Sequence, residues 1–352
     1  DDLTISPYDG QNLILEVSGN NEIIFKKGDI SYNLADLSNI ASSGGGSGSG
    51  IQNGDDVSFQ NVDISGTLTI DGSNVIINNK NITVTEGITG TPIGYSQLGS
   101  EISGENSGDY SGSGIALSYD GTRIAIGAGR NNGGSSGFKG HVRVFDWNGS
   151  SWVQVGSDID NTDISASTNG VFGFNLSMSN DGNILAIGNS KWTNNGNTDP
   201  DYRKGRVHVY ELIGGNWTLK GNILEGDDID DIFGTEIALI GNGTRIFVGS
   251  VQDDDGGINS GSVKIYDWNG STWILNATIN GSSTGDYFGV GIATSGDGNS
   301  VVISATGTND YVKVYDYINS SWTIRGSSIL HPNNNTPWGN DVAISNDGNR
   351  IV

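Results

Sequence analysis

The sequence predicts an all-β protein with three parts: a small N-terminal β module, a fibre-like shaft of short strands, and a partial β-propeller of four-stranded blades. Three observations predict this fold class. Short β-branched apolar runs follow one another, the 56 glycines recur at fixed places between them, and a long block repeats along the C-terminal part. Long helices are not expected, because no window holds a 3.6-residue apolar period.

The repeat is clearest where an aromatic residue precedes a glycine. The marker glycines lie 61, 61, 55 and 50 residues apart, and Ser111 replaces the aromatic residue in the first block. They are Gly112, Gly173, Gly234, Gly289 and Gly339. This period is typical of propeller blades rather than helical solenoids. Four blocks are complete and residues 337–352 begin a fifth, so residues 95–352 are predicted to form the propeller.

Each complete block predicts four strands. A GIALS-type strand turns through Asp-Gly or Asn-Gly into an RIAIGA-type strand, a variable connection leads to an HVRVFD-type strand, and an NGSS-type turn leads to a strand that opens with tryptophan. One sheet of this kind cannot bury both faces, but radially packed sheets can. We therefore interpret four tryptophans as packing between blades: Trp152, Trp217, Trp273 and Trp322.

Residues 95–102 match a fourth strand but precede the first block. In a closed ring, such an N-terminal strand completes the last blade. The fifth block supplies a first strand and most of a second, so this interpretation predicts further sequence beyond Val352 that includes at least a third strand.

The residues before Tyr95 divide into three segments. Residues 1–41 contain short apolar runs and are predicted to form the small β module, and residues 42–50 form a Gly/Ser linker. Residues 51–94 hold apolar pairs at period two, such as Val57/Phe59 and Leu68/Ile70. Strands this short cannot close a core within one chain. A shaft in which several copies wrap around one axis would cover these faces; an ordinary β-sandwich edge or small β-roll is the alternative.

Composition excludes several classes of function. The net charge is −23, from 40 acidic and 17 basic residues, which disfavours nucleic acid and membrane partners. Cysteine is absent, so disulfides and thiolate chemistry are excluded. No apolar run is long enough to cross a bilayer. The chain begins at Asp1 without a start methionine or signal-peptide pattern, which predicts a processed product or an excerpt.

The repeats resemble two known families. Phe172-Gly173, Phe233-Gly234 and Phe288-Gly289, with the AIGA-type second strand, are similar to the FG-GAP propeller family, and the Tyr-Asp-to-Trp spacing is similar to kelch repeats. Residues 57–78 and 36–43 resemble shaft and linker segments of virus and bacteriophage tail fibres. These resemblances imply a virion-associated fibre or appendage with a propeller head that attaches to a host surface.

The FG-GAP resemblance also implies calcium loops within the hairpins, but here those hairpins are too short to surround a cation. Acidic clusters in longer loops are weak Ca²⁺ candidates, with a solvated loop as the alternative: Asn195, Asn197, Asp199 and Asp201; Asp227, Asp228, Asp230 and Asp231; Asp253, Asp254 and Asp255. The three histidines, His141, His208 and His331, show no metal-ligand spacing and no pairing with a nucleophile. We therefore expect no catalytic residues, and no cofactor apart from this possible calcium.

The leading functional hypothesis is a homotrimeric fibre on the virion surface or in the extracellular space. Its N-terminus would bind other virion proteins, and the connections between second and third strands would contact a host glycan or protein. Those connections are residues 129–139, 190–204 and 251–260. The alternatives are a secreted or surface adhesin of a marine microbe and, less favoured, a propeller-fold enzyme.

Overall fold

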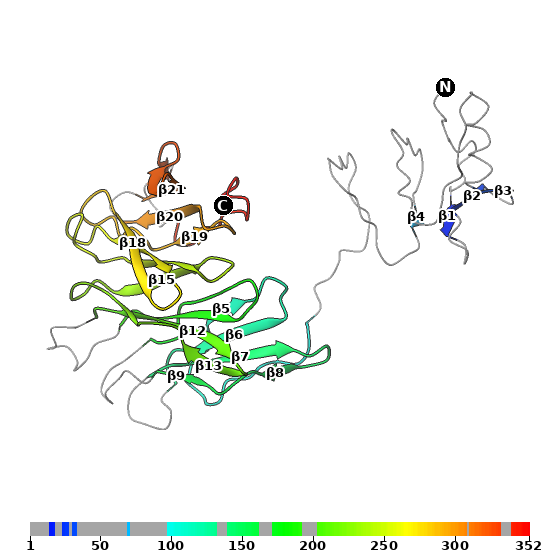
Figure 1. Ribbon diagram of the computed structural model, residues 1–352, viewed down its shortest axis with the longest axis horizontal. Helices are drawn as coiled ribbons and strands as arrows, with labels where there is room; N and C mark the ends of the chain where they lie inside the picture. Colours follow the sequence, from blue (N-terminus) through cyan, green and yellow to red (C-terminus); the bar gives the residue numbers. More distant parts are fainter. Residues whose placement is uncertain are drawn as a thin grey trace. The chain divides into compact units, whose positions relative to one another are not determined.

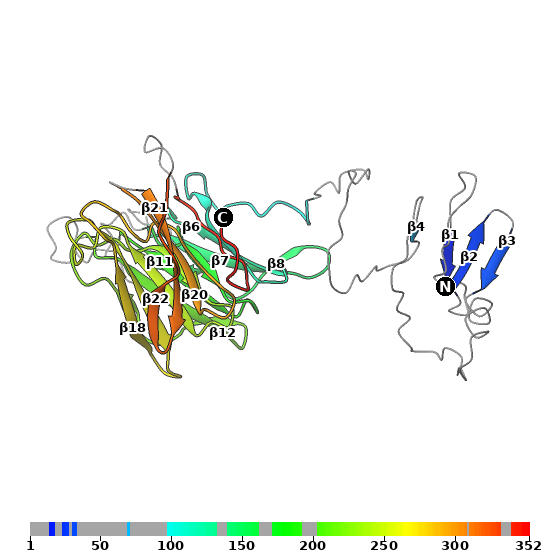
Figure 2. The same ribbon diagram turned by 90° about the horizontal axis from the view of Figure 1, so that it is seen from above.

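A computed structural model describes residues 97–131, 139–161, 171–191, 203–307, 310–331 and 339–352, together with the backbone of four short strands nearer the N-terminus. The chain divides into two compact units, Asp1–Gly94 and Tyr95–Val352 (Figures 1 and 2). Each unit is described by itself. No helix in the described part of the chain has the length and hydropathy needed to cross a membrane.

The N-terminal unit contains one four-stranded sheet. Its strands are β1 (Ile14–Val17), β2 (Ile23–Lys27), β3 (Ile30–Asn33) and β4 (Thr69–Ile70), in the order β3-β2-β1-β4. β1, β2 and β3 form an antiparallel meander, and β4 pairs with β1 in parallel. A strand from the predicted shaft segment therefore joins the sheet of the predicted β module. The linker and most of residues 51–94 lie outside the described residues.

The C-terminal unit contains four successive antiparallel sheets, here called blades one to four (Figure 1). Blade one holds β5 (Ser111–Leu117), β6 (Arg123–Ala128), β7 (His141–Trp147), β8 (Trp152–Gln154) and β9 (Ile159–Asp160). Blade two holds β10 (Leu176–Met178), β11 (Ile184–Asn189), β12 (Arg206–Ile213), β13 (Asn216–Leu219) and β14 (Leu224–Glu225). Blade three holds β15 (Phe233–Leu239), β16 (Arg245–Ser250), β17 (Ser262–Trp268) and β18 (Trp273–Asn280). Blade four holds β19 (Ile292–Thr294), β20 (Ser300–Thr306), β21 (Asp310–Ile318), β22 (Ser321–Ile324) and β23 (Ile329–Leu330).

In every blade the strands pair in chain order, first with second, second with third and third with fourth. The first strands β5, β10, β15 and β19 adjoin one another from blade to blade. The partial fifth block, residues 339–352, contributes an antiparallel bridge between Ile344 and Ile351. The prediction of an all-β, propeller-like chain of four-stranded sheets is confirmed.

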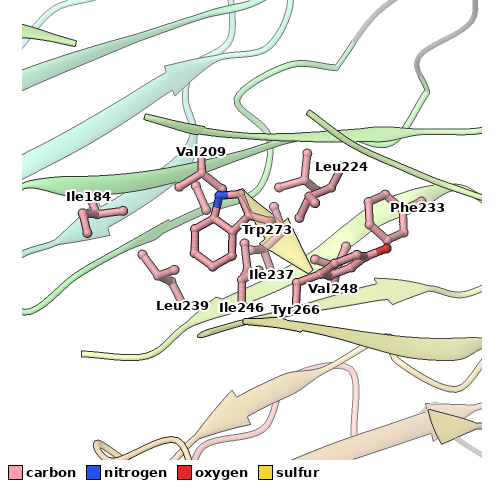
Figure 3. Close-up of a cluster of buried hydrophobic side chains, with 12 residues drawn as sticks. Ile184, Val209, Leu224, Phe233, Ile237, Leu239, Ile246, Val248, Tyr266 and Trp273 are labelled. Carbon is pink, nitrogen blue, oxygen red and sulfur yellow. The ribbon is translucent and has the colours of Figure 1, made fainter. Parts of the chain in front are cut away.

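The hydrophobic core lies between blades. Between blades two and three, Val209 and Leu224 meet Phe233, Ile237 and Trp273 (Figure 3). Equivalent clusters join blades one and two, blades three and four, and blade four and the fifth block. The phenylalanine of each Phe-Gly pair is fully buried in these clusters: Phe172, Phe233 and Phe288. Neighbouring sheets thus bury the faces that they turn toward each other.

The glycine after that phenylalanine allows neighbouring backbones to meet. Gly173, Gly234 and Gly289 have φ near +90°, a conformation that glycine adopts without strain. A Cβ added at Gly249, in the AIGA-type strand of blade three, would lie 2.3 Å from the carbonyl oxygen of Gly289 in blade four. Both glycine motifs of the repeat therefore serve the same close contact between blades.

The tryptophans of the fourth strands in blades two and three bond to the preceding blade. Nε1 of Trp217 donates to the carbonyl of Val155 at 3.1 Å, and Nε1 of Trp273 donates to the carbonyl of Lys220 at 2.9 Å. In both cases a glycine with positive φ, Gly156 or Gly221, follows that carbonyl and ends the fourth strand. This places the tryptophans between blades, as the sequence predicts.

Blade three departs from this pattern. Ile159 and Leu224 follow their tryptophans by seven residues, whereas Ile279 follows Trp273 by six, and the glycine is missing. The fourth strand, β18, therefore continues unbroken to Asn280, with a register shift beside Ile265. The next tryptophan, Trp322, has a buried Nε1 without a hydrogen-bond partner among the described residues.

Residues 97–102 form no strand, in contrast to the sequence prediction of a fourth strand over residues 95–102. They nevertheless occupy the place of a fourth-strand end. The carbonyl of Leu98 accepts a hydrogen bond from Trp152 Nε1 at 3.0 Å, and Gly99 lies against the ring of Trp147. No third strand lies beside them in the described part of the chain to provide ladder hydrogen bonds, so the contact consists of the tryptophan bond and the packing of Gly99 on Trp147.

Arginine side chains join the blades at the hairpin end. Arg245 forms a bidentate pair with Asp267, at 2.6 and 3.0 Å, and its Nη1 donates to the carbonyl of Gly298 in the next blade. Arg123 makes the equivalent contacts with Asp146 and with Gly182. Bidentate arginine–carboxylate pairs hold their geometry tightly, so they fix each hairpin on its neighbour.

The indole hydrogen bond between blades gives a matched pair of variants. Trp273→Phe removes ring atoms and the bond to Lys220, which leaves a buried carbonyl without its donor. Trp322→Phe removes the same atoms but no hydrogen bond. We expect Trp273→Phe to lower the free energy of unfolding by about 1–3 kcal/mol more than Trp322→Phe, measured by urea denaturation. Equal losses would contradict the assigned role of this bond.

Candidate functional site

The two ends of the blades carry different types of connection. In an antiparallel meander, the connection from the first to the second strand and the connection from the third to the fourth lie at one end, called here the hairpin end. The connections from second to third strand and from one blade to the next lie at the other end, called here the loop end. The two acidic clusters among the described residues, Asp227–Asp231 and Asp253–Asp255, both fall at the loop end.

The hairpin end is nearly uniform. Ser118 Oγ donates to Asp120 Oδ1, and the same bond recurs between Ser179 and Asp181, Ser295 and Asp297, and Ser345 and Asp347. The backbone hydrogen bond from Thr122, with those from Ser118 and the Thr122 hydroxyl, lowers the pKa of Asp120 to about 2. These carboxylates accept the hydrogen bonds of their own turns.

The loop end of blade three contains a buried ion cluster. Lys264 Nζ lies 2.8 Å from Asp227 and 3.1 Å from Asp253, and both Lys264 and Asp253 are buried. Ser262 Oγ donates to the same Asp253 oxygen at 2.8 Å. Burial opposes the charge of Lys264, but the hydrogen bonds and charges of the two aspartates raise its pKa above the ordinary value. Asp227 and Asp253, two of the predicted calcium ligands, therefore both pair with the ammonium group of Lys264.

The other described candidates also have internal partners. Asp231 is buried and accepts the backbone N–H of Asp228, and burial, with the charge of Asp253, raises its pKa to about 6. Asp230 pairs with Arg203 at 2.6 Å. Asp254 accepts the N–H of Asn259, and the N–H of Asp255 donates to Asp253. Asn195, Asn197, Asp199 and Asp201 lie outside the described residues.

Blade four has a carboxylate at the position of Asp231. Asp286 is fully buried, and its Oδ2 accepts the N–H groups of Ser282 and Ser283 and the hydroxyl of Tyr311 at 3.0 Å. Burial, reinforced by this carboxylate, raises the pKa of Tyr311 to about 12. The loop end is thus built from aspartates that organise the connections between blades.

A constellation that sequence reasoning missed lies at the loop end of blade one. Glu105, His141 and Asp158 each bring one potential ligand atom into a group whose members all lie within 4.8 Å of one another. His141 Nδ1 is 3.8 Å from Glu105 Oε2 and 3.9 Å from Asp158 Oδ2. No spacing rule reveals this set, because His141 begins β7 while Glu105 and Asp158 come from two separate connections.

The two remaining histidines contact neighbouring residues of the framework. His208 packs edge-on against Phe172 and stacks on Tyr210, between blades one and two. The backbone N–H of His331 donates to the carbonyl of Asp310.

On the first strand of blade three, burial and the nearby charge of Asp341 raise the pKa of Glu236 to about 7.

No family model matches the chain, and no curated protein matches its sequence. Among solved structures, it is similar to hydrazine synthase from Kuenenia stuttgartiensis, with a TM-score of 0.43 and 16% identity over 73% of this chain and 58% of that one. It is also similar to a candidate 6-phosphogluconolactonase from Bacteroides fragilis (TM-score 0.43, 14% identity, 67% and 61% coverage). A third similar structure is a candidate 6-phosphogluconolactonase from Bacteroides uniformis (TM-score 0.38, 12% identity, 68% and 76% coverage). Likenesses this weak give no information on activity.

The Lys264 cluster predicts a large stability effect. Lys264→Met leaves Asp253 buried without its cation, and we expect a loss of about 3–5 kcal/mol in the free energy of unfolding. The matched control is Lys313→Met, at the equivalent position of blade four, where the half-buried ammonium donates to the Ser282 hydroxyl. We expect that change to cost about 1 kcal/mol or less. Urea denaturation compares the two, and a Lys313→Met loss as large as that of Lys264→Met would contradict the cluster's role.

Proposed function

We propose that this chain is a binding and structural protein, a virion-associated fibre or appendage whose propeller-like unit attaches to a host surface through its loop end. The observation that carries the proposal is the contrast between the two ends of the blades. The hairpin end repeats the same turn bonds in successive blades, whereas each blade builds its loop end from different charged residues. Binding surfaces commonly lie on variable loops held by a rigid framework.

The N-terminal unit is assigned a supporting role in this proposal. Its segment 51–94 would form a homotrimeric shaft, because paired apolar positions at period two outnumber what one chain of short strands covers. Its N-terminus would bind other virion proteins, which places the molecule on the virion surface or in the extracellular space. The FG-GAP-like and fibre-like sequence segments support this assignment.

Two alternatives differ in class. A secreted or surface adhesin of a marine microbe would use the same loop end without a virus, and immunogold labelling of particles and of cell envelopes distinguishes the two. An enzyme is favoured by one observation, the near-neutral pKa of Glu236. A single raised carboxylate also occurs in structural settings, so binding remains the proposal.

The test uses an array of cell-surface glycans and the purified chain. We expect binding that is lost when the predicted connections 129–139, 190–204 and 251–260 are all replaced by Gly-Ser segments of equal length in a chain that keeps Asp253, because this side chain pairs with the buried Lys264. The matched control is Ser150→Arg with Ser271→Arg, two exposed residues in turns at the hairpin end, which should bind as the parent does. Light scattering of the parent chain should give the mass of a trimer.

Three outcomes contradict the proposal in separate ways. Binding that survives the replacement of all three connections removes the loop end as the contact surface. Equal losses in the control variant show that the effect is not local. A monomeric mass removes the trimeric shaft while leaving the binding result standing.

A further inference from the structure

We propose that Glu105, His141 and Asp158 form a binding site for one divalent cation of the zinc type, with a fourth position open to solvent. The site lies at the loop end of blade one. It is independent of the attachment function, and it differs from the acidic clusters that the sequence indicates as calcium candidates.

The first argument is the convergence of three chain segments. His141 is the first residue of β7, Asp158 directly precedes β9, and Glu105 lies in the connection that leads into β5. The separations from His141 Nδ1, 3.8 and 3.9 Å, are too long for hydrogen bonds. They match the separation of two ligands on one zinc ion, roughly 3–4 Å when each ligand lies about 2.0–2.2 Å from the metal.

The second argument is the burial of the imidazole. His141 is only 2% exposed, whereas Glu105 and Asp158 are 40% and 30% exposed. Within the described residues, the His141 ring makes these two long contacts and no hydrogen bond. A buried imidazole with only long polar contacts, facing two carboxylates at the protein surface, is well placed to bind a cation that enters from solvent.

The carboxylates are oriented by neighbouring amides. Asp158 accepts a hydrogen bond from Gln154 Nε2 on Oδ1, at 2.7 Å, which leaves Oδ2 facing His141. Asn131 Nδ2 lies 3.5 Å from Glu105 Oε2 and 3.1 Å from Asp109. Such outer partners hold metal ligands in place and tune their affinity.

At the position equivalent to His141, blade two has a residue that carries its own positive charge. There, the first residue of β12 is Arg206, and its Nη2 pairs with Glu225 at 2.5 Å. Blade two therefore supplies its own cation, just as Lys264 does in blade three. Blade one has a histidine in this place, which offers an imidazole nitrogen to a metal ion where blade two has an arginine.

The donor set selects the metal. One imidazole nitrogen and two carboxylate oxygens suit zinc, which takes nitrogen and oxygen ligands in a tetrahedral arrangement. Calcium requires six to eight oxygen ligands, more than this site offers. A bound ion would join the connection that carries Glu105 to the third strand of blade one.

The experiment is a calorimetric titration of zinc chloride into the chelator-treated full chain near neutral pH. We expect one zinc per chain. Glu105→Gln and Asp158→Asn, which alter surface carboxylates, should each weaken binding by more than the roughly 10–100-fold typical of outer partners. Zinc should also raise the thermal unfolding midpoint of the parent chain but not that of the double variant. Calcium chloride in place of zinc should give no saturable heat.

The matched controls are Glu101→Gln, an exposed glutamate on the same connection, and His331→Gln, which removes another histidine. Both should bind zinc as the parent chain does. The proposal is overturned if the parent takes up no zinc, or if Glu105→Gln and Asp158→Asn bind it as tightly as the parent. It is also overturned if His331→Gln alone abolishes binding, because the ion then lies elsewhere.

Discussion

A four-stranded sheet of this sequence has two apolar faces, and it buries them only against neighbouring sheets. The core clusters lie between blades, as do the indole hydrogen bonds, the arginine contacts to hairpin carbonyls and the glycine-on-glycine approach of Gly249 and Gly289. Within one blade, the pairing of strands satisfies the backbone hydrogen bonds, but most of the hydrophobic stabilisation comes from contacts with the next blade. The architecture behaves as a row of nearest-neighbour contacts, as in repeat proteins generally.

This arrangement separates stability from recognition. At the hairpin end, carboxylates fix the individual turns and arginines join each turn to the next blade, so these residues have little freedom to vary. At the loop end the same strand framework holds Lys264 with two aspartates in blade three, Arg206 with Glu225 in blade two, and His141 with two carboxylates in blade one. The first part of the third strand thus carries different charged groups in successive blades: His141 and Arg206 are its first residues, and Lys264 is its third. Our proposals for attachment and for zinc both rest on this end.

Much of the blade could be predicted from the sequence, because its signals are periodic. The Phe-Gly and AIGA-type motifs, the hairpin Asp-Gly pairs and the recurring tryptophans located the strands and the contacts between blades. The sequence analysis did not predict that the fourth strand ends at Gly156 and Gly221. Blade three lacks this glycine before Ile279, and that difference in the sequence indicates its longer fourth strand. The positive φ of Ile232 could not be predicted from the sequence, because a β-branched residue rarely adopts this conformation. The set of Glu105, His141 and Asp158 could not be found either, since tertiary packing alone joins these three positions, which are distant in the sequence.

The central claim is that contacts between blades, rather than contacts within each blade, set local stability. In this structure, Ile115 and Leu117 on the first strand of blade one are 57% and 53% exposed, while the equivalent face of blade three is buried between its neighbours. Hydrogen exchange of backbone amides, followed by mass spectrometry, tests the claim most directly. The account predicts stronger protection in β15 and β16 than in β5 and β6, which pair in the same way but whose outer face is uncovered. Equal protection of β5–β6 and β15–β16 would contradict it.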